Sequence, residues 1–275
     1  MTQFRTLTLF DCPHLHMDHI CYDSVEDFSY HHHDICELLF LLKGDAFYSN
    51  EGRVYTLKKN SLVFTRPFVN HVVTFRQHEE YERYYLLFDE KKLSSGIQER
   101  IPAGLEVVDC EGNRLICDLF KKTDYYCSHF NGDTLANILF HLTEEVLYNL
   151  CILAGDGEQN DMYTVNPLIN EAVKYINENI SSPLNIEALC NQLYISKSHM
   201  HNLFIKHLQM SPKKYIISKR LIMAQRELRL GANPSEIYQR CGFSDYSTFY
   251  REYKQYFGYP PSAEASKEMS REINS

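Results

Sequence analysis

Short apolar and alternating runs fill the first third of the chain. They are CELLFLL, AFYSN, RVYTL, SLVF and HVVTF, and turn formers such as KGD, EG and KKN separate them. Short runs rich in Val, Phe and Tyr predict strands, and closely spaced turns predict an antiparallel barrel or sandwich. We therefore expect a small β-barrel between Tyr30 and Phe88.

After Asn113 the apolar residues recur every three or four positions, as they do along one face of a helix. The segment between Leu115 and Leu150 predicts two amphipathic helices that are apolar on more than one side. We expect them to pack on the barrel and to form the interface of a homodimer.

The chain from residue 166 onward predicts helices alone. A short helix, a tight turn and a second helix occur twice, an arrangement that places a helix in the major groove of DNA. The helix that connects the two units, of about 19 residues, would span about 28 Å, close to the ~34 Å between successive major grooves on one face of DNA. Capping residues, prolines and glycines set the expected bounds at Pro167–Ile180, Asn185–Leu193, Lys197–His207, Pro212–Leu230, Pro234–Cys241 and Tyr246–Phe257.

The most polar and turn-prone stretch, GDGEQND, begins at Gly155. We place the first domain at 1–155, a linker at 156–165 and the second domain at 166–275. The whole chain has a net charge of −8, but the second domain holds 14 basic and 10 acidic residues and the remainder holds 14 and 26. This split makes the helical domain the candidate for contact with nucleic acid.

The 275 residues are 44% hydrophobic and 23% charged, which excludes a disordered chain. No apolar stretch approaches the ~20 residues of a membrane helix, and the first residues lack the features of a signal peptide. We expect a cytoplasmic protein with no membrane partner. The nine cysteines include no CxxC pair, and we find no catalytic triad and no glycine-rich phosphate loop. We expect no cofactor.

The segments IEALCNQLYISKSHMHNLFIKHLQMSPKKYIISKRLIMAQREL and IYQRCGFSDYSTFYREYKQYFGYPP resemble the double helix-turn-helix domain of AraC/XylS-type transcription regulators. Cys190 and Tyr238 differ from that family, which usually has alanine in each short positioning helix. The usual Tyr-Arg after the last proline is also missing. The matching residues are Arg220, Leu221, Ala224, Gly242, Phe243, Phe249, Arg251, Lys254, Phe257, Gly258 and Pro261.

Residues that face away from the apolar stripe of each second helix are the candidates for DNA contact. The resemblance places Ser198, His201 and Asn202 at base-contacting positions, and an asparagine amide suits bidentate pairing with adenine. The candidates are Lys197, Ser198, His201, Asn202 and Lys206 in the first unit, Tyr246, Ser247, Tyr250 and Arg251 in the second, and Lys213, Lys214 and Lys254 as contacts to phosphate, which carries no sequence information.

A second constellation lies in the predicted barrel. His31, His33 and Glu37 share parity, so their side chains point to one face of an extended strand, and Pro67 and His71 follow downstream. This spacing resembles the two cupin motifs, and cupin-like barrels are a common sensing domain of AraC-type regulators. The resemblance implies a cupin or jelly-roll-like sensing domain.

Three interpretations of these residues remain open. We favour the first, in which they are hydrogen-bonding groups for a small polar ligand with no metal. In the second, His31, His33, Glu37 and His71 form a metal shell, as in metal-dependent cupin enzymes. In the third, they are satisfied polar residues on a strand surface. The candidate ligand contacts are His31, His33, Glu37, Tyr48, Arg66, His71 and Arg83.

The two domains together predict a regulator, and not an enzyme, that binds double-stranded promoter DNA and responds to a small-molecule effector. RNA polymerase is a further candidate partner, and activation is the commoner role in the resembled family. The 20 tyrosines suit contact with a sugar, so we expect a carbohydrate effector. The alternatives are a metal-dependent cupin enzyme with an appended helical domain and an architectural DNA-binding protein with a vestigial barrel.

Overall fold

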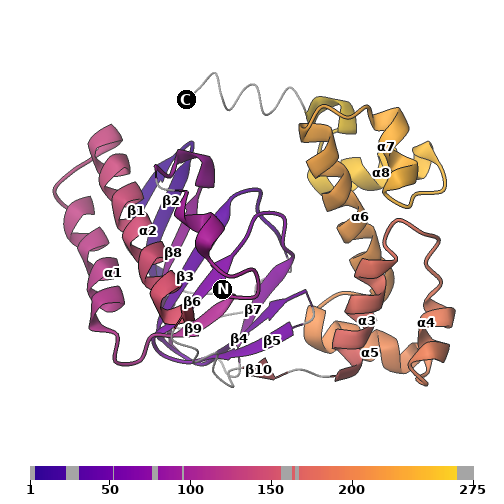
Figure 1. Ribbon diagram of the computed structural model, residues 1–275, viewed down its shortest axis with the longest axis horizontal. Coiled ribbons are helices and arrows are strands. Elements are labelled where there is room, and N and C mark those ends of the chain that lie inside the picture. Colours follow the sequence, from indigo (N-terminus) through magenta and orange to yellow (C-terminus); the bar gives the residue numbers. More distant parts are fainter. Residues whose placement is uncertain are drawn as a thin grey trace. The chain divides into compact units, whose positions relative to one another are not determined.

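The computed structural model describes residues 4–22, 31–51, 53–75, 80–94, 96–155, 163–164 and 167–264. The chain forms two compact units, the first ending at Thr164 and the second comprising the helices that follow (Figure 1). Antiparallel strands and two long helices make up the first unit, and the second is helical. Within the described residues, no helix has the length and apolar character needed to cross a bilayer.

The described strands of the first unit lie in two antiparallel sheets. The larger has the order β1-β2-β8-β3-β6-β9 and the smaller the order β10-β5-β4-β7. The bounds are β1 Phe4–Cys12, β2 Leu15–Tyr22, β3 Cys36–Lys43, β4 Ala46–Asn50, β5 Arg53–Leu57, β6 Ser61–Thr65, β7 His71–Phe75, β8 Tyr81–Phe88, β9 Val107–Asp109 and β10 Tyr163–Thr164, and the helices are η1 Glu90–Lys92, η2 Ile97–Arg100, α1 Arg114–Cys127 and α2 Gly132–Gly155.

The expected antiparallel architecture is confirmed, but its extent and closure differ from the prediction. The described strands form two sheets and not one closed barrel, and β1 and β2 precede the predicted start at Tyr30. The sequence of β2, LHMDHICY, does not show the usual alternation of a strand, because the polar residues Asp18 and His19 are buried. Tyr163 pairs with Tyr55, so part of the predicted linker is a strand. Residues 156–162 lie outside the described part of the chain.

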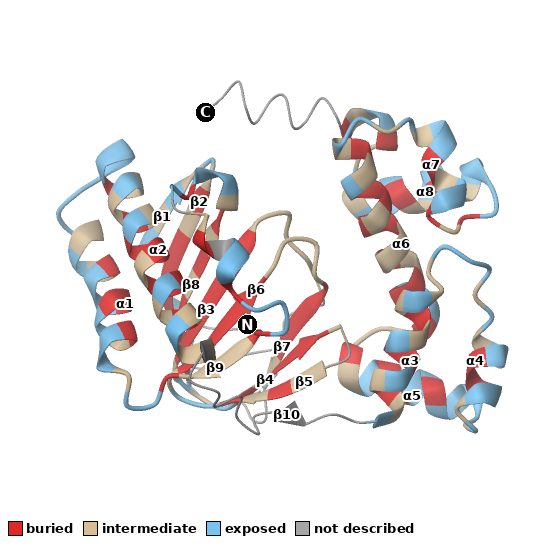
Figure 2. Cartoon of the chain, in the orientation of Figure 1, coloured by how far each residue is buried: buried red, intermediate tan, exposed pale blue. Residues whose placement is uncertain are grey.

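Strand β3 is buried on both of its faces (Figure 2). Leu38 and Phe40 pack in the core that the larger sheet shares with α1 and α2. Leu39 and Leu41 lie in a second core, together with Tyr48 of the smaller sheet. Successive residues of a strand point to opposite faces, so this strand supplies both cores, and its sequence is almost continuously apolar for that reason.

A partly buried polar network connects α1 to the larger sheet. The Asp124 carboxylate on α1 accepts hydrogen bonds from the Thr8 hydroxyl at 2.5 Å and the Tyr84 hydroxyl at 2.6 Å. Its Oδ2 also lies 2.9 Å from Nδ1 of His19, whose Nε2 lies 3.0 Å from Oε1 of Glu82. Burial would lower the pKa of His19, but the two carboxylates outweigh it and raise that pKa above its usual value. A protonated imidazole that donates to both carboxylates satisfies this geometry.

The second unit contains the expected series of helices. Asn185, Ser196, Ser211, Asn233 and Asp245 each accept a backbone N–H at a helix start, as the capping pattern predicts. The predicted cap at residue 166 lies outside the described residues. The helices are α3 Pro167–Glu178, α4 Ile186–Gln192, α5 Lys197–Leu208, α6 Pro212–Arg229, α7 Pro234–Arg240, α8 Tyr246–Phe257 and η3 Pro261–Ala263.

Arg220 on α6 holds the turn of the second helix-turn-helix unit against the end of α3. Its Nε donates to the carbonyl of Ile180 at 3.0 Å, and its Nη2 donates to the carbonyl of Ser182 at 2.8 Å. Gly242, with φ of +80°, lies directly over this contact. A Cβ at that position would come within 2.6 Å of the Ile180 oxygen and 2.7 Å of the Arg220 Nε. Only glycine fits both the backbone conformation and the available space.

We expect Asp124→Asn to reduce the free energy of unfolding by about 1–2 kcal/mol, because the variant loses a charge-assisted bond to His19 in a partly exposed site. A histidine whose folded-state pKa is raised contributes stability that is fully present below its unfolded pKa of about 6.5 and is lost as the pH rises through the folded pKa. Thermal unfolding between pH 6 and 8 should therefore show a smaller loss of stability in the variant than in the parent chain.

Asp118→Asn is the matched control, because Asp118 lies on the same helix with a side chain that is 63% exposed. Equal destabilisation by the two substitutions, or an unchanged pH profile in Asp124→Asn, would contradict the role given to the network.

Candidate functional site

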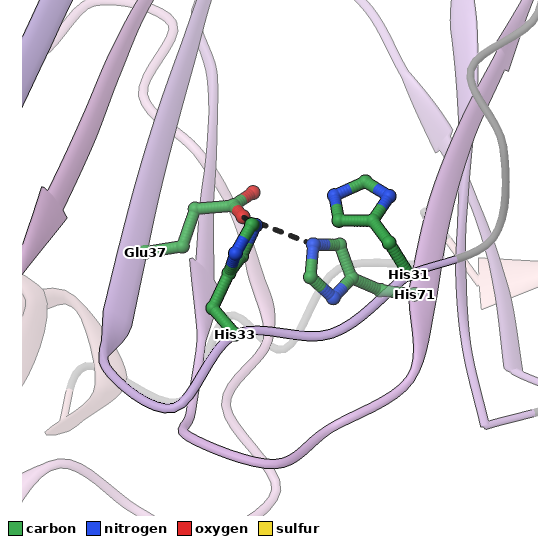
Figure 3. Close-up of side chains that lie close together, drawn as sticks. All are labelled: His31, His33, Glu37 and His71. Atoms are coloured by element: carbon green, nitrogen blue, oxygen red, sulfur yellow. Dashed lines mark hydrogen bonds and ion pairs between the residues drawn. The ribbon is translucent and has the colours of Figure 1, made fainter. Parts of the chain in front are cut away.

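Three histidines and one glutamate converge between the two sheets of the first unit (Figure 3). Glu37 lies on β3, His33 just before it, and His71 at the start of β7, where its backbone forms a bridge with His31. The Glu37 Oε2 atom lies 2.9 Å from Nε2 of His71 and 3.2 Å from Nε2 of His33. One side-chain nitrogen or oxygen from each of the four lies within 4.8 Å of the others.

The charge of the cluster is concentrated on Glu37 and His71, which are 2% and 1% exposed. Burial would raise the pKa of the Glu37 carboxyl, but the positive charge of His71 and the hydrogen bonds from His33 and His71 hold that pKa well below its usual range. Burial would lower the pKa of His71, but the Glu37 carboxylate raises it above its usual value. A carboxylate and an imidazolium thus stabilise each other in a buried site.

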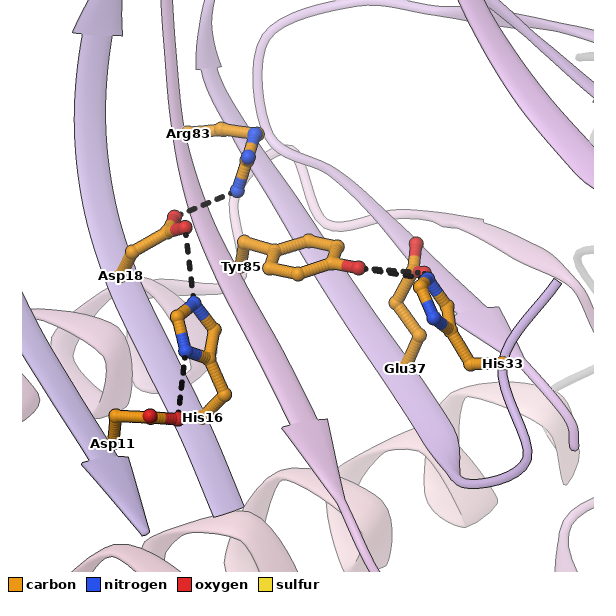
Figure 4. Close-up of polar contacts among 7 residues, drawn as sticks. All are labelled: Asp11, His16, Asp18, His33, Glu37, Arg83 and Tyr85. Carbon is orange, nitrogen blue, oxygen red and sulfur yellow. Dashed lines mark hydrogen bonds and ion pairs between the residues drawn. The ribbon is translucent and has the colours of Figure 1, made fainter. Parts of the chain in front are cut away.

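A tyrosine that the sequence analysis did not single out completes this cluster. The Tyr85 hydroxyl donates to Oε2 of Glu37 at 3.2 Å and lies 2.9 Å from Nε2 of His33 (Figure 4). Tyr85 shares a face of β8 with Arg83, whose guanidinium carbon lies 4.4 Å from the centre of the tyrosine ring. Side chains alternate between the two faces of a strand, so Tyr85 lies on the same face of β8 as Arg83, two residues before it. This alternation could have identified Tyr85 from the sequence.

The polar network continues from Arg83 along the same sheet. Arg83 donates to Oδ1 of Asp18 at 2.7 Å, and both residues are almost fully buried. His16 lies between Asp18 and Asp11, at 3.4 Å and 3.2 Å from their carboxylate oxygens. The hydrogen bond to Asp18 is the main cause that raises the pKa of His16 above its usual value. Sequence reasoning missed Asp18 and His16 because it did not recognise β2 as a strand.

Two other predicted ligand contacts have different surroundings. The Tyr48 hydroxyl lies 2.7 Å from that of Thr65, and its ring centre lies 5.9 Å from that of His71, beside the cluster. The Arg66 guanidinium donates to three backbone carbonyls of the 101–105 segment, at 2.7 to 3.1 Å. The structure thus gives Arg66 a role in holding that loop, and the cluster does not include it.

The candidate DNA-contacting residues lie on exposed faces of α5 and α8 and at the start of α6, in the second unit. Helix α5 buries Met200, Leu203 and Phe204, and α8 buries Phe249 and Tyr253. The opposite faces are open. The exposed candidates are Lys197, Ser198, His201, Asn202 and Lys206 on α5, Lys213 and Lys214 at the start of α6, and Tyr246, Ser247, Tyr250, Arg251 and Lys254 on α8.

The residues that replace the usual alanines pack within the second unit. Cys190 is buried in α4. Tyr238 on α7 is half-buried, and its ring packs edge-on against Tyr246, with ring centres 5.8 Å apart. The larger side chain therefore turns toward the start of α8 and supports the first residue of its exposed face.

The fold and these two sites define a two-domain protein that joins a ligand-binding sandwich to a double helix-turn-helix. The family profile of the AraC-like ligand binding domain matches residues 21–106, and that of a helix-turn-helix domain matches residues 189–266. The chain belongs to the AraC-type family of transcription regulators. Members of that family are not enzymes, so the alternative of a metal-dependent cupin enzyme is disfavoured.

Curated relatives are similar over different parts of the chain. The raffinose operon transcriptional regulatory protein RafR of Pediococcus pentosaceus is 36% identical over 148 residues, which are 54% of this chain and 52% of that protein. The HTH-type transcriptional activator RhaS of Escherichia coli is 21% identical over 240 residues, 86% of each chain. The HTH-type transcriptional regulator GbdR of Pseudomonas aeruginosa is 31% identical over 102 residues, 37% of this chain and 28% of that protein.

Proposed function

We propose that this protein is a sequence-specific DNA-binding transcription regulator controlled by a small molecule. The observation that carries the proposal is the pair of exposed polar faces on α5 and α8, which occupy equivalent positions in two helix-turn-helix units joined by α6. Each face offers side chains that hydrogen-bond base edges, and adjacent lysines offer charge to the phosphates. We propose that it acts in the cytoplasm, because the named relatives come from bacteria, in which promoter DNA lies in that compartment.

We propose that the effector binds between the two sheets of the first unit. The carboxylate, imidazole and hydroxyl groups of Glu37, His71 and Tyr85 converge there with Tyr48 and Arg83 nearby, which is the composition of a site for a small polar molecule. A carbohydrate fits these groups, and the name of RafR supports a sugar for that relative. RhaS is named an activator, which supports activation here, with RNA polymerase as a partner.

An effector changes transcription only if it binds two arrangements of the protein with different affinity. The arrangement we propose to be affected is a homodimer formed through α1 and α2. Tyr148 and Ile152 lie one turn apart on α2 and are 45% and 62% exposed, and Tyr125 on α1 is 59% exposed. Exposed apolar side chains on helices that also cover the core are typical of subunit interfaces.

We expect Asn202→Ala to reduce the affinity for a specific DNA site by about 1–3 kcal/mol and to relax specificity at one base position. Lys213→Ala should weaken binding to all sequences alike and reduce the salt dependence of binding. Titration of fluorescent DNA with the full chain at two salt concentrations measures both. Lys121→Ala, an exposed lysine on α1, is the control. Unchanged affinity in Asn202→Ala and Lys213→Ala would contradict the assignment of α5 to the major groove.

For the dimer, we expect Ile152→Asp to convert the protein to a monomer while its circular dichroism spectrum is retained, because a carboxylate would lose its water in the interface. Light scattering coupled to size exclusion gives the mass. Lys59→Ala, at an exposed position of the turn before β6, should leave the mass unchanged. A parent chain that is already monomeric, or a dimer that survives Ile152→Asp, would rule out this interface.

A further inference from the structure

We propose that His31, His33, Glu37 and His71 bind one divalent ion of the first transition series. The donor set of three imidazoles and one carboxylate suits Mn²⁺, Fe²⁺, Co²⁺, Ni²⁺ or Zn²⁺. An ion about 2.1 Å from each donor would place neighbouring donors about 3.0 Å apart and opposite donors about 4.2 Å apart. The observed 2.9 and 3.2 Å contacts, with all donors within 4.8 Å, require movements of a few tenths of an ångström.

The surroundings of the ligands orient them toward a common point. Nδ1 of His71 lies 3.0 Å from the carbonyl of Val69, so its Nε2 is the atom directed at Glu37. The Tyr85 hydroxyl holds the same carboxylate oxygen that both imidazoles approach. Outer hydrogen bonds of this kind fix ring orientation in metal sites. Glu37 and His71 are fully buried, and His31 and His33 are half-buried, so the site is accessible from the histidine side.

A polar cluster that served the fold alone would need fewer imidazoles. A single histidine satisfies a buried carboxylate, and His71 already does so at 2.9 Å. His31 nevertheless lies with its ring centre 4.4 Å from that of His71 and 4.9 Å from that of His33. Three imidazole nitrogens gathered around one carboxylate are more donors than that carboxylate needs, and they make a set that a divalent ion binds. The donor count therefore favours a metal, contrary to the metal-free expectation from sequence.

Four protein donors leave two positions open on a six-coordinate ion. If the chain is the effector-responsive regulator proposed above, an effector with vicinal hydroxyl or carboxylate oxygens would fill these two positions. Only this statement about the effector rests on the proposed function. Arg83 and Tyr85 lie on the same sheet face as Glu37 and would contact the remainder of such a molecule.

The test is titration of chelator-treated, full-length protein with Co²⁺ alone, followed by absorption spectroscopy and calorimetry. We expect one ion per chain, visible d–d bands, and a loss of affinity of about 100-fold or more in His33→Ala and in Glu37→Gln. His32→Ala is the matched control from the same histidine run, since His32 is not part of the cluster. Circular dichroism and DNA binding of each variant establish that it is folded.

Absence of a stoichiometric ion in the folded parent chain, or equal Co²⁺ affinity in all the variants, would overturn the metal site. DNA binding is measured on the same samples, so failure of the metal proposal and failure of the regulator proposal give different results.

A second inference concerns α8 and rests on the proposed DNA-binding function. Tyr246 and Tyr250 lie one turn apart, are 38% and 36% exposed, and have ring centres 6.2 Å apart. Tyr238 and Phe249 pack against Tyr246 and support its ring. We infer that this aromatic face contacts thymine, because the C5-methyl of thymine is the apolar group that base pairs present in the major groove.

The test uses a site selected from random DNA by the full chain, with uracil replacing thymine in one half-site at a time. The half-site of α8 is the one whose specificity survives Asn202→Ala. Replacement there should weaken binding about fourfold per contacted thymine, which corresponds to about 0.8 kcal/mol for one buried methyl group. The weaker binding to uracil-containing DNA should persist in Tyr250→Phe and disappear in Tyr250→Ala.

A uracil effect that is equal in the parent chain and Tyr250→Ala, or no effect of uracil in the α8 half-site, would overturn the inference. Failure to select any sequence would instead contradict the proposed function.

Discussion

The hydrogen bonds from Arg220 to the carbonyls of Ile180 and Ser182 set the geometry on which the second unit depends. They attach the middle of α6 to the end of α3, and Gly242 brings the turn before α8 against the same guanidinium. Because α6 is 18 residues long, it extends about 27 Å and separates the two helix-turn-helix units by nearly one turn of DNA. The proposed contact of one chain with two groove segments requires a spacing of this kind.

The first unit meets a different constraint, the burial of charge between two sheets. Its inner face places Glu37, Arg83 and Asp18 away from water, and each has an oppositely charged or hydrogen-bonding partner within 3 Å. Buried ionic groups add little to stability compared with apolar ones, and this argument supports the binding role that we propose for them. The outer face of the same sheet uses apolar residues and the Asp124 network to hold α1, the helix proposed to lie at the dimer interface.

Local chemistry explains which parts of the structure were predictable. Helix starts were accurate because Ser196, Ser211 and Asp245 cap their helices through their own side chains. Strand β2 was missed because its polar residues are buried by partners distant in sequence, Arg83 among them. The even spacing of His33 and Glu37 correctly predicted that their side chains meet. The position of Arg66 was not predictable in this way, because its partners are backbone carbonyls of a loop and no pattern of side chains identifies them.

The most direct test of the account is the spacing of the DNA site that one chain protects. Sites selected by the full-length protein should contain two half-sites about 10 base pairs apart, and insertion of about 5 base pairs should abolish specific binding, because it rotates one half-site to the opposite side of the duplex. Specific binding that tolerates this insertion, or that needs only one half-site per chain, would contradict the claim that α5 and α8 read successive major grooves.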